Sequence, residues 1–325
     1  MEMNCTNTIP YAKELVGNLD DVGKGLVIST GVSMLLTLGI SLISLRLVIR
    51  NVPPGDERWI SSWLVGICPI VGVTSFVGII SPRSIHIDEL VSAIYVSLSV
   101  AVFFRLMILY HGGEETMCRT LKGVKLPMSK PPFCCCICLR NVYVNRRTLR
   151  RIKLIVYQVL VVRPVLLYAD AVIKSEEKFT EASLARNPVQ VIVSVFTILS
   201  TMLSLLGLIT TFRLSLKPLK AHGVVPKFLY VKLILLFCDP QKMILGLVVT
   251  AGLLPCSPLF HHPLRGETLK FVLLCFEMLL VSLLGMKVFG RETPGSESVE
   301  LKGKGPINHG TDNGALAVYS EKPAL

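Results

Sequence analysis

Long runs of apolar residues alternate with shorter polar and basic connections along most of the chain. Seven runs are long enough, at about 20 residues each, to cross the hydrocarbon core of a bilayer as helices. Their ranges are Leu26–Ile49, Ile60–Ile80, Leu90–Tyr110, Leu154–Ile173, Pro188–Phe212, Phe228–Leu254 and Leu269–Phe289. Because a helix satisfies its own backbone polar groups in lipid, the pattern predicts an all-α membrane protein with seven transmembrane helices.

The composition and the two ends of the chain agree with this prediction. Of the 325 residues, 51% are hydrophobic and 17% are charged, and the mean hydropathy is +0.60; a soluble domain carries more charge. Residues 1–25 are polar and lack the basic start of a signal peptide, so we expect an extracellular segment before a retained first span. Residues 290–325 are rich in Gly, Pro, Ser and charge, which predicts a disordered cytoplasmic tail after the transmembrane domain of residues 26–289.

Basic residues in the connections indicate the orientation. With the N-terminus outside, the cytoplasmic side holds 21 Lys and Arg residues and the outer side 7. Since cytoplasmic connections are the more basic ones, we expect an outside N-terminus and a cytoplasmic C-terminus. Asn4 lies in the triplet Asn4-Cys5-Thr6, which becomes a candidate N-glycosylation site in that orientation.

The longest connection, residues 111–153, combines a cysteine run with a basic stretch and is predicted to be cytoplasmic. The reducing cytosol disfavours disulfides, and adjacent cysteines without a second ligand pair make a poor zinc site. Juxtamembrane thiols beside basic residues favour S-acylation next to anionic lipid. Unmodified thiols remain an alternative, as does a basic stretch that only orients the fourth span. The candidate acylation sites are Cys134, Cys135, Cys136 and Cys138.

Several predicted spans contain ionisable residues, which are expensive in hydrocarbon and mark functional sites or buried pairs. One interpretation is a polar path that receives an anionic solute; the other is structural pairing or snorkelling of long side chains. The candidate path residues are Arg163, Asp170, Lys232, Asp239, Lys242 and Glu277.

Helical spacing refines these expectations. Asp170 follows Arg163 by seven residues, two helical turns, so both side chains share a face. Asp239 and Lys242 are three residues apart, a spacing that permits a local pair. We expect Arg105 to snorkel from a span end.

Two other features of the spans are less specific. Lys270 and Lys287 are assigned to span ends, where a charge needs no special role. Pro69, Pro164 and Pro240 are expected to interrupt three spans, as in transporters whose broken helices line a cavity.

Two other heptahelical classes fit poorly. A receptor normally has a disulfide from the third span to the second outer loop, but residues 81–95 and 174–187 contain no cysteine. A membrane hydrolase needs metal-binding histidines within the bundle, whereas all six histidines fall in loops, at a span edge or in the tail. We therefore expect no catalytic residue, metal or cofactor, and no nucleic-acid partner.

Local motifs in the family's order resemble the Ost-alpha family, the alpha subunits of the organic solute transporter. They extend from about residue 80 to residue 280 and comprise Ser81-Pro82-Arg83-Ser84, Gly112-Gly113-Glu114, Arg119-Thr120-Leu121, Cys134–Cys138, Arg146–Lys153, Lys227-Phe228, Gln241, Cys256-Ser257-Pro258 and Leu274–Met278.

The resemblance implies a function and a partner. It implies facilitated transport of bile acids, conjugated steroids and similar amphipathic anions, and assembly with a single-span beta subunit among the membrane lipids. It also implies a plasma-membrane location, basolateral in polarised cells, with some protein in the endoplasmic reticulum. Asp239-Pro240 departs from the family pattern, so a related heptahelical protein acting in signalling or as a receptor stays the alternative.

Overall fold

The computed structural model describes residues 11–124, 143–176, 188–216, 218–219, 223–253 and 262–290. The chain divides into two units, Met1–Thr293 and Pro294–Leu325, and every described residue belongs to the first. Asn4, the cysteine run Cys134–Cys138 and the tail from Arg291 lie outside the described residues, so the predictions made for them stay predictions.

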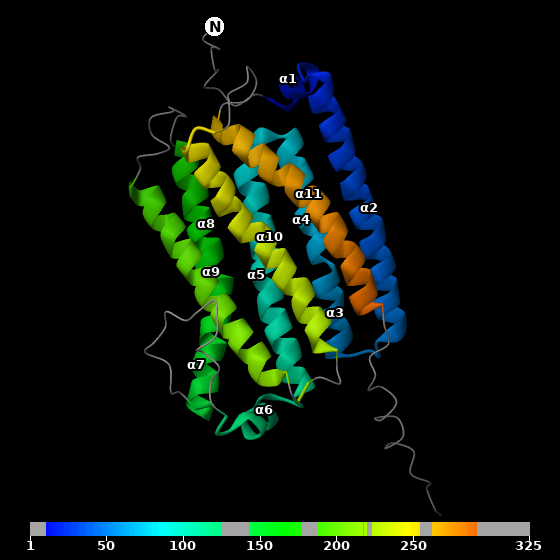
Figure 1. Ribbon diagram of the computed structural model, residues 1–325, viewed down its shortest axis with the longest axis vertical. Coiled ribbons are helices and arrows are strands. Elements are labelled where there is room, and N and C mark those ends of the chain that lie inside the picture. Colours follow the sequence, from blue (N-terminus) through cyan, green and yellow to red (C-terminus); the bar gives the residue numbers. More distant parts are fainter. Residues whose placement is uncertain are drawn as a thin grey trace, which may run out of the picture. The chain divides into compact units, whose positions relative to one another are not determined.

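The described residues form a bundle of helices (Figure 1). In chain order the elements are α1 Ala12–Gly17, α2 Asp21–Asn51, α3 Asp56–Val65, α4 Ile67–Ile80, the 3-10 turn η1 Pro82–Ser84, α5 Ile85–Tyr110, α6 Glu114–Leu121, α7 Arg146–Tyr157, α8 Val159–Glu176, α9 Pro188–Ser215, α10 Val224–Thr250 and α11 His262–Phe289.

Six helical segments of the described residues are long and apolar enough to cross a membrane, which confirms the predicted all-α membrane fold. They are Asp21–Asn51, Asp56–Ile80, Pro82–Tyr110, Arg146–Ile173, Ile192–Ser215 and Leu264–Phe289. Each overlaps a predicted span. The remaining predicted span, Phe228–Leu254, corresponds to α10, a helix of 27 residues. Because α10 carries four charged residues along its length, the seventh span stays a prediction, as does the orientation.

The second span consists of two helices, α3 and α4, that meet at Gly66. Pro69 follows three residues later and lacks the N–H that would continue the hydrogen-bond ladder. The hydroxyl of Tyr95 donates to the carbonyl of Trp63 at 3.0 Å, and a Cβ at Gly66 would lie 2.3 Å from that hydroxyl. The tyrosine thus fills the break that only glycine leaves open.

The other two prolines do not break their helices, contrary to the expectation from sequence. Pro164 lies inside α8 and Pro240 inside α10, and both helices continue through them. Neighbouring helices in a bundle stabilise backbone groups that such a proline frees.

Helix α11 is central to the packing. It contacts α2, α4 and α10, and it crosses between α2 and α10 in Figure 1. The side of α2 that is buried against its neighbours, which include α4 and α11, carries small polar side chains, which permit close approach of two helices in a membrane. Ser33 on α2, for example, donates to the carbonyl of Cys275 on α11 at 3.0 Å. The buried α2 side chains in this row are Thr30, Ser33, Thr37, Ser41 and Ser44.

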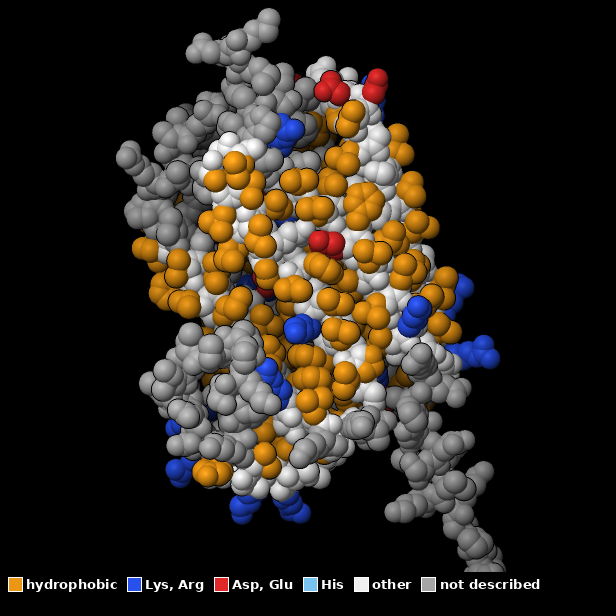
Figure 2. Space-filling model, viewed as in Figure 1, with side chains coloured by type: hydrophobic (Ala, Val, Ile, Leu, Met, Phe, Trp, Pro, Cys, Tyr) orange, Lys and Arg blue, Asp and Glu red, His pale blue; other side chains and the backbone are white. Residues whose placement is uncertain are grey.

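Charged residues at one end of the bundle form ion pairs between helices. Arg105 lies 2.8 Å from Asp56, so the side chain expected to snorkel has an ion-pair partner. Nearby, Lys227 at the start of α10 donates to the hydroxyl of Tyr110, which donates to Glu57 at 2.6 Å. These contacts join α3, α5 and α10. Figure 2 shows Lys and Arg side chains at the end where α6 and α7 lie, below a largely hydrophobic middle.

Candidate functional site

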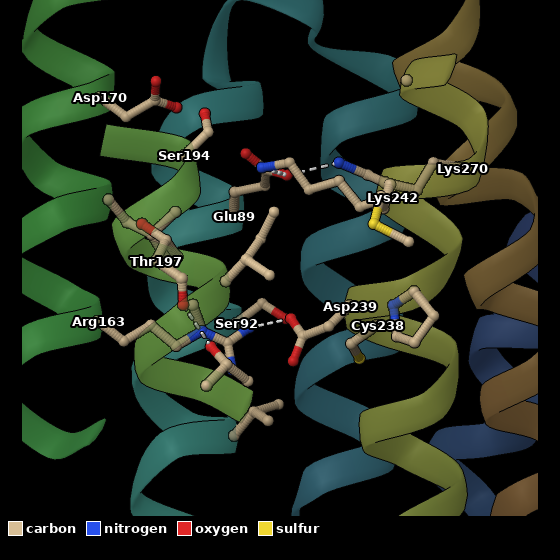
Figure 3. Close-up of a pocket in the computed structure, with 18 of the residues that line it drawn as sticks. Glu89, Ser92, Arg163, Asp170, Ser194, Thr197, Cys238, Asp239, Lys242 and Lys270 are labelled. Carbon is tan, nitrogen blue, oxygen red and sulfur yellow. Dashed lines mark hydrogen bonds and ion pairs between the residues drawn. The ribbon is translucent and has the colours of Figure 1, made fainter. Parts of the chain in front are cut away.

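A cavity of about 380 Å³ lies between the helices of the bundle, and residues from six of them line it. Its walls come mainly from α5, α8, α9 and α10, with contributions from α4 and α11. The described lining residues include three cationic and three acidic side chains: Arg163, Lys242, Lys270, Glu89, Asp170 and Asp239. Figure 3 shows these side chains pointing into the space between the helices.

Arg163 on α8 and Asp239 on α10 form a buried ion pair across the cavity. The guanidinium Nη2 lies 2.5 Å from Asp239 Oδ1, and the two side chains are 7% and 22% exposed. Within the described part of the chain, Arg163 Nε and Nη1 have no hydrogen-bond partner, and neither does Asp239 Oδ2. Buried polar groups are normally paired, because an unpaired one costs about 1–3 kcal/mol or more. The pair therefore retains donors that suit an incoming anion.

A second charged cluster joins α5, α10 and α11. Glu89 forms two ion pairs: its Oε1 lies 2.8 Å from Lys242 Nζ and 2.6 Å from Lys270 Nζ. Lys270 also pairs with Glu267, one turn before it on α11. Sharing two carboxylates between two lysines neutralises charges that would be costly if buried alone. Figure 3 shows Lys242 and Lys270 converging on Glu89.

Hydroxyl and apolar side chains complete the lining, so the cavity is amphipathic. The hydroxyl-bearing side chains are Ser75, Ser92, Ser194, Thr197 and Thr201. Thr197 and Thr201 donate to carbonyls four residues earlier on α9, at 2.8 and 2.9 Å, which leaves their lone pairs as acceptors. The larger apolar side chains are Val96, Leu167, Val193, Ile198, Met202, Met243, Phe271 and Leu274.

Four of the six candidate path residues lie around this one cavity: Arg163, Asp170, Asp239 and Lys242. Arg163 and Asp170 share a face of α8, as their spacing predicts. Asp239 and Lys242 do not pair with each other as their spacing permits; Asp239 binds Arg163 and Lys242 binds Glu89.

The other two candidates do not line the cavity. Lys232 is exposed on α10. Glu277 accepts a hydrogen bond from Gln241 at 3.2 Å, at the contact between α10 and α11.

Sequence reasoning missed Lys270, which was placed at a span end, and Glu89, which precedes the predicted span Leu90–Tyr110. Lys270 is buried, since α11 begins at His262 and extends beyond the predicted start of its span. The spacing of polar residues on α5 and α9 could have indicated a polar cavity at this position. Glu89 and Ser92 are three residues apart on α5, and Ser194, Thr197 and Thr201 follow three- and four-residue steps on α9.

The fold and the cavity define a multi-pass helical membrane protein with a charged, amphipathic interior. A family model described as organic solute transporter Ostalpha matches residues 26–294. The chain therefore belongs to the organic solute transporter Ostalpha family, a family of transporter subunits and not of enzymes.

Curated relatives match over most of their length. The chain is 26% identical to the organic solute transporter subunit alpha of Danio rerio, over 92% of each chain. It is 24% identical to the subunit of the same name from Leucoraja erinaceus, over 85% of this chain and 78% of the relative. It is 25% identical to organic solute transporter alpha-like protein 3 of Caenorhabditis elegans, over 86% and 81%. No solved structure matches the chain.

Proposed function

We propose that the chain is the larger subunit of a transporter that passes amphipathic organic anions across the membrane by facilitated transport. Bile acids and conjugated steroids are the solutes we assign to it. The observation that carries the proposal is Arg163, a cation buried in an amphipathic cavity with two donors that no described protein group accepts.

The geometry at Arg163 suits a carboxylate or sulfate head. A guanidinium binds such groups through parallel donors in a planar fork. One donor already binds the carboxylate of Asp239, so a solute head that resembles this carboxylate competes for the same cation. The hydroxyls of Ser92 and Thr197 lie beside Arg163 in Figure 3 and provide further polar contacts.

The apolar walls suit the rest of an amphipathic solute. A volume of about 380 Å³ falls at the lower end of the range of about 300–1,000 Å³ typical of small-molecule sites. Phe271, Leu274 and Met243 offer surface to a hydrocarbon skeleton whose charged head binds Arg163. Burial of that skeleton then favours solutes with a large apolar body over small inorganic anions.

The charge balance favours release as well as binding. Of the lining residues that the structure describes, three are cationic and three acidic, so an anionic solute meets no large excess of positive charge. Asp239 competes with the solute for Arg163 and promotes departure. A passive transport site needs this balance, because binding must be strong enough for entry and weak enough for exit.

A single-span beta subunit completes the proposed transporter, and the two assemble as a hetero-oligomer. We place the complex in the plasma membrane, basolateral in polarised cells, with some protein in the endoplasmic reticulum. The relatives' designation as alpha subunits supports the existence of a second subunit.

Uptake of a radiolabelled sulfated steroid tests the proposal. Cells expressing the full chain with a single-span beta subunit are compared with cells that express either protein alone. We expect saturable uptake above background only when both are present. Equal uptake in cells lacking both proteins, or none with every beta subunit tried, would contradict the proposal.

A further inference from the structure

The exposed side of α10 and α11 has a pattern that suits a third helix. On α11 the exposed residues recur at alternating steps of three and four, the spacing of a helix-packing seam. On α10 the exposed residues Leu229, Lys232 and Leu236 follow steps of three and four. We define the α10–α11 face by the exposed residues Leu229, Lys232, Leu236 and Leu247 of α10 and Leu273, Phe276, Leu280, Leu283 and Lys287 of α11. The two helices contact each other along their length.

Glu277 lies beside this face at the middle of a membrane span. It is 13 residues after Leu264 and 12 before Phe289, the ends of that span, which places it about 18–20 Å from either end at the helical rise. A glutamate is too short to reach the interface from that depth, and an intramembrane carboxyl requires a polar partner. Lys232 differs, because it lies eight residues after the start of α10 and its long stem allows the ammonium group to extend toward that end.

The protein groups around Glu277 provide only part of what it needs. Gln241 donates to Glu277 Oε1 at 3.2 Å. Among the described residues, Glu277 Oε2 and Gln241 Oε1 are buried and have no donor. Glu277 is only half-buried and does not line the cavity. Glu277 is therefore a partly exposed carboxyl at mid-span whose printed hydrogen-bond donor is Gln241, and lipid tails cannot supply a further donor.

We propose that the α10–α11 face binds one membrane-spanning helix of a partner, with a hydrogen-bond donor side chain at the depth of Glu277. This inference rests on the proposed function, which requires a single-span subunit, and it assigns the surface that this subunit contacts. A helix is the occupant because only a helix or a closed barrel satisfies its own backbone inside the bilayer. The apolar rows on either side of Glu277 suit contact with the apolar face of such a helix.

The exposed face of α2 provides the contrast. Its large side chains, among them Val32, Leu35 and Leu42, are as exposed as those of the α10–α11 face. No charged residue occurs between Gly25 and Leu45, so lipid tails satisfy that face without a protein partner.

Site-directed photo-crosslinking in cells tests the assignment. A benzophenone amino acid replaces Leu280 on the α10–α11 face or Leu35 on α2, which are 66% and 64% exposed. The full chain is co-expressed with an epitope-tagged single-span beta subunit. We expect an adduct that carries the tag from position 280 and none from position 35. Equal adducts from both positions, no adduct from 280, or an adduct between two copies of this chain would overturn the proposal.

Substitution of Glu277 tests the polar contact. Glu277→Leu removes both acceptors, whereas Glu277→Gln retains one. We expect the amount of beta subunit that co-purifies with Glu277→Leu to fall about fivefold, the scale of one interhelical hydrogen bond in a bilayer, and Glu277→Gln to retain more. Gel filtration in detergent verifies that each variant is folded. If folded Glu277→Leu co-purifies with as much beta subunit as the wild type does, Glu277 makes no polar contact with the partner, and that part of the proposal is wrong.

The outcome is separable from that of the transport proposal, because assembly is measured without solute. An adduct at position 280 in cells that take up no sulfated steroid would support the interface and contradict the transport activity.

Discussion

The guanidinium of Arg163 on α8 lies 2.5 Å from the carboxylate of Asp239 on α10, joining residues 76 positions apart in the chain. Both side chains line the same cavity. Removal of one partner from a buried ion pair normally leaves an uncompensated charge and costs about 3–5 kcal/mol. The pair therefore braces α8 against α10, and it also holds a cation where a solute anion is able to compete for it.

Replacing Asp239 tests this competition. Asp239→Asn keeps the size of the side chain and removes the charge that neutralises Arg163. We expect the KM for a sulfated steroid to fall about tenfold, the scale of one hydrogen bond to a charged group. The maximal rate also falls, because release is slower. Initial-rate uptake over a range of solute concentrations measures both, and an unchanged KM would mean that Asp239 does not compete with the solute.

Exchanging the two charges separates bracing from solute binding. Arg163→Asp alone leaves two facing carboxylates and is expected to reduce the yield of folded protein. Combining it with Asp239→Arg restores an ion pair between α8 and α10 and should recover the yield. Uptake should stay low, because the cation is then held by the other helix. Recovery of neither quantity would show that the two side chains are not coupled.

The two lysines that bind Glu89 allow a comparison of how much a buried and a more exposed ion pair contribute to the stability of the fold. The side chain of Lys270 is 4% exposed and that of Lys242 is 38% exposed. Lys270→Gln removes a buried cation from two carboxylates, so we expect a loss of about 3–5 kcal/mol. Lys242→Gln removes a more solvated one and should cost about 1 kcal/mol or less. Thermal unfolding in detergent compares them, and equal losses would contradict the burial argument.

Acylation of the cysteine run is a separate prediction, since these residues lie outside the described part of the chain. Replacing Cys134, Cys135, Cys136 and Cys138 by serine should abolish hydroxylamine-sensitive palmitate labelling. Cys118→Ser, at a half-buried free thiol of α6, serves as the control and should keep the labelling. Full labelling of the fourfold variant would assign acylation to other cysteines.

Hydropathy predicted the membrane fold well, because the requirement for long apolar helices acts locally along the chain. It did not predict which ionisable residues meet. Asp239 has Lys242 one turn away, yet its partner is Arg163 on another helix; only tertiary packing decides between them. Lys270 was assigned to a span end and Glu89 was given no role, and their pairing depends on how α5 and α11 pack. Pro240 lies inside a continuous helix, because neighbouring helices stabilise the backbone groups that the proline frees.

The most direct test of the account is steroid uptake into proteoliposomes by the Arg163→Gln complex. Arg105→Gln is the matched control, because Arg105 also forms an ion pair, with Asp56, but does not line the cavity. We expect Arg163→Gln to lower uptake by about tenfold or more, the loss of a charge-assisted contact with the solute, and Arg105→Gln to retain nearly full uptake. Wild-type uptake by a folded, assembled Arg163→Gln complex would contradict the account.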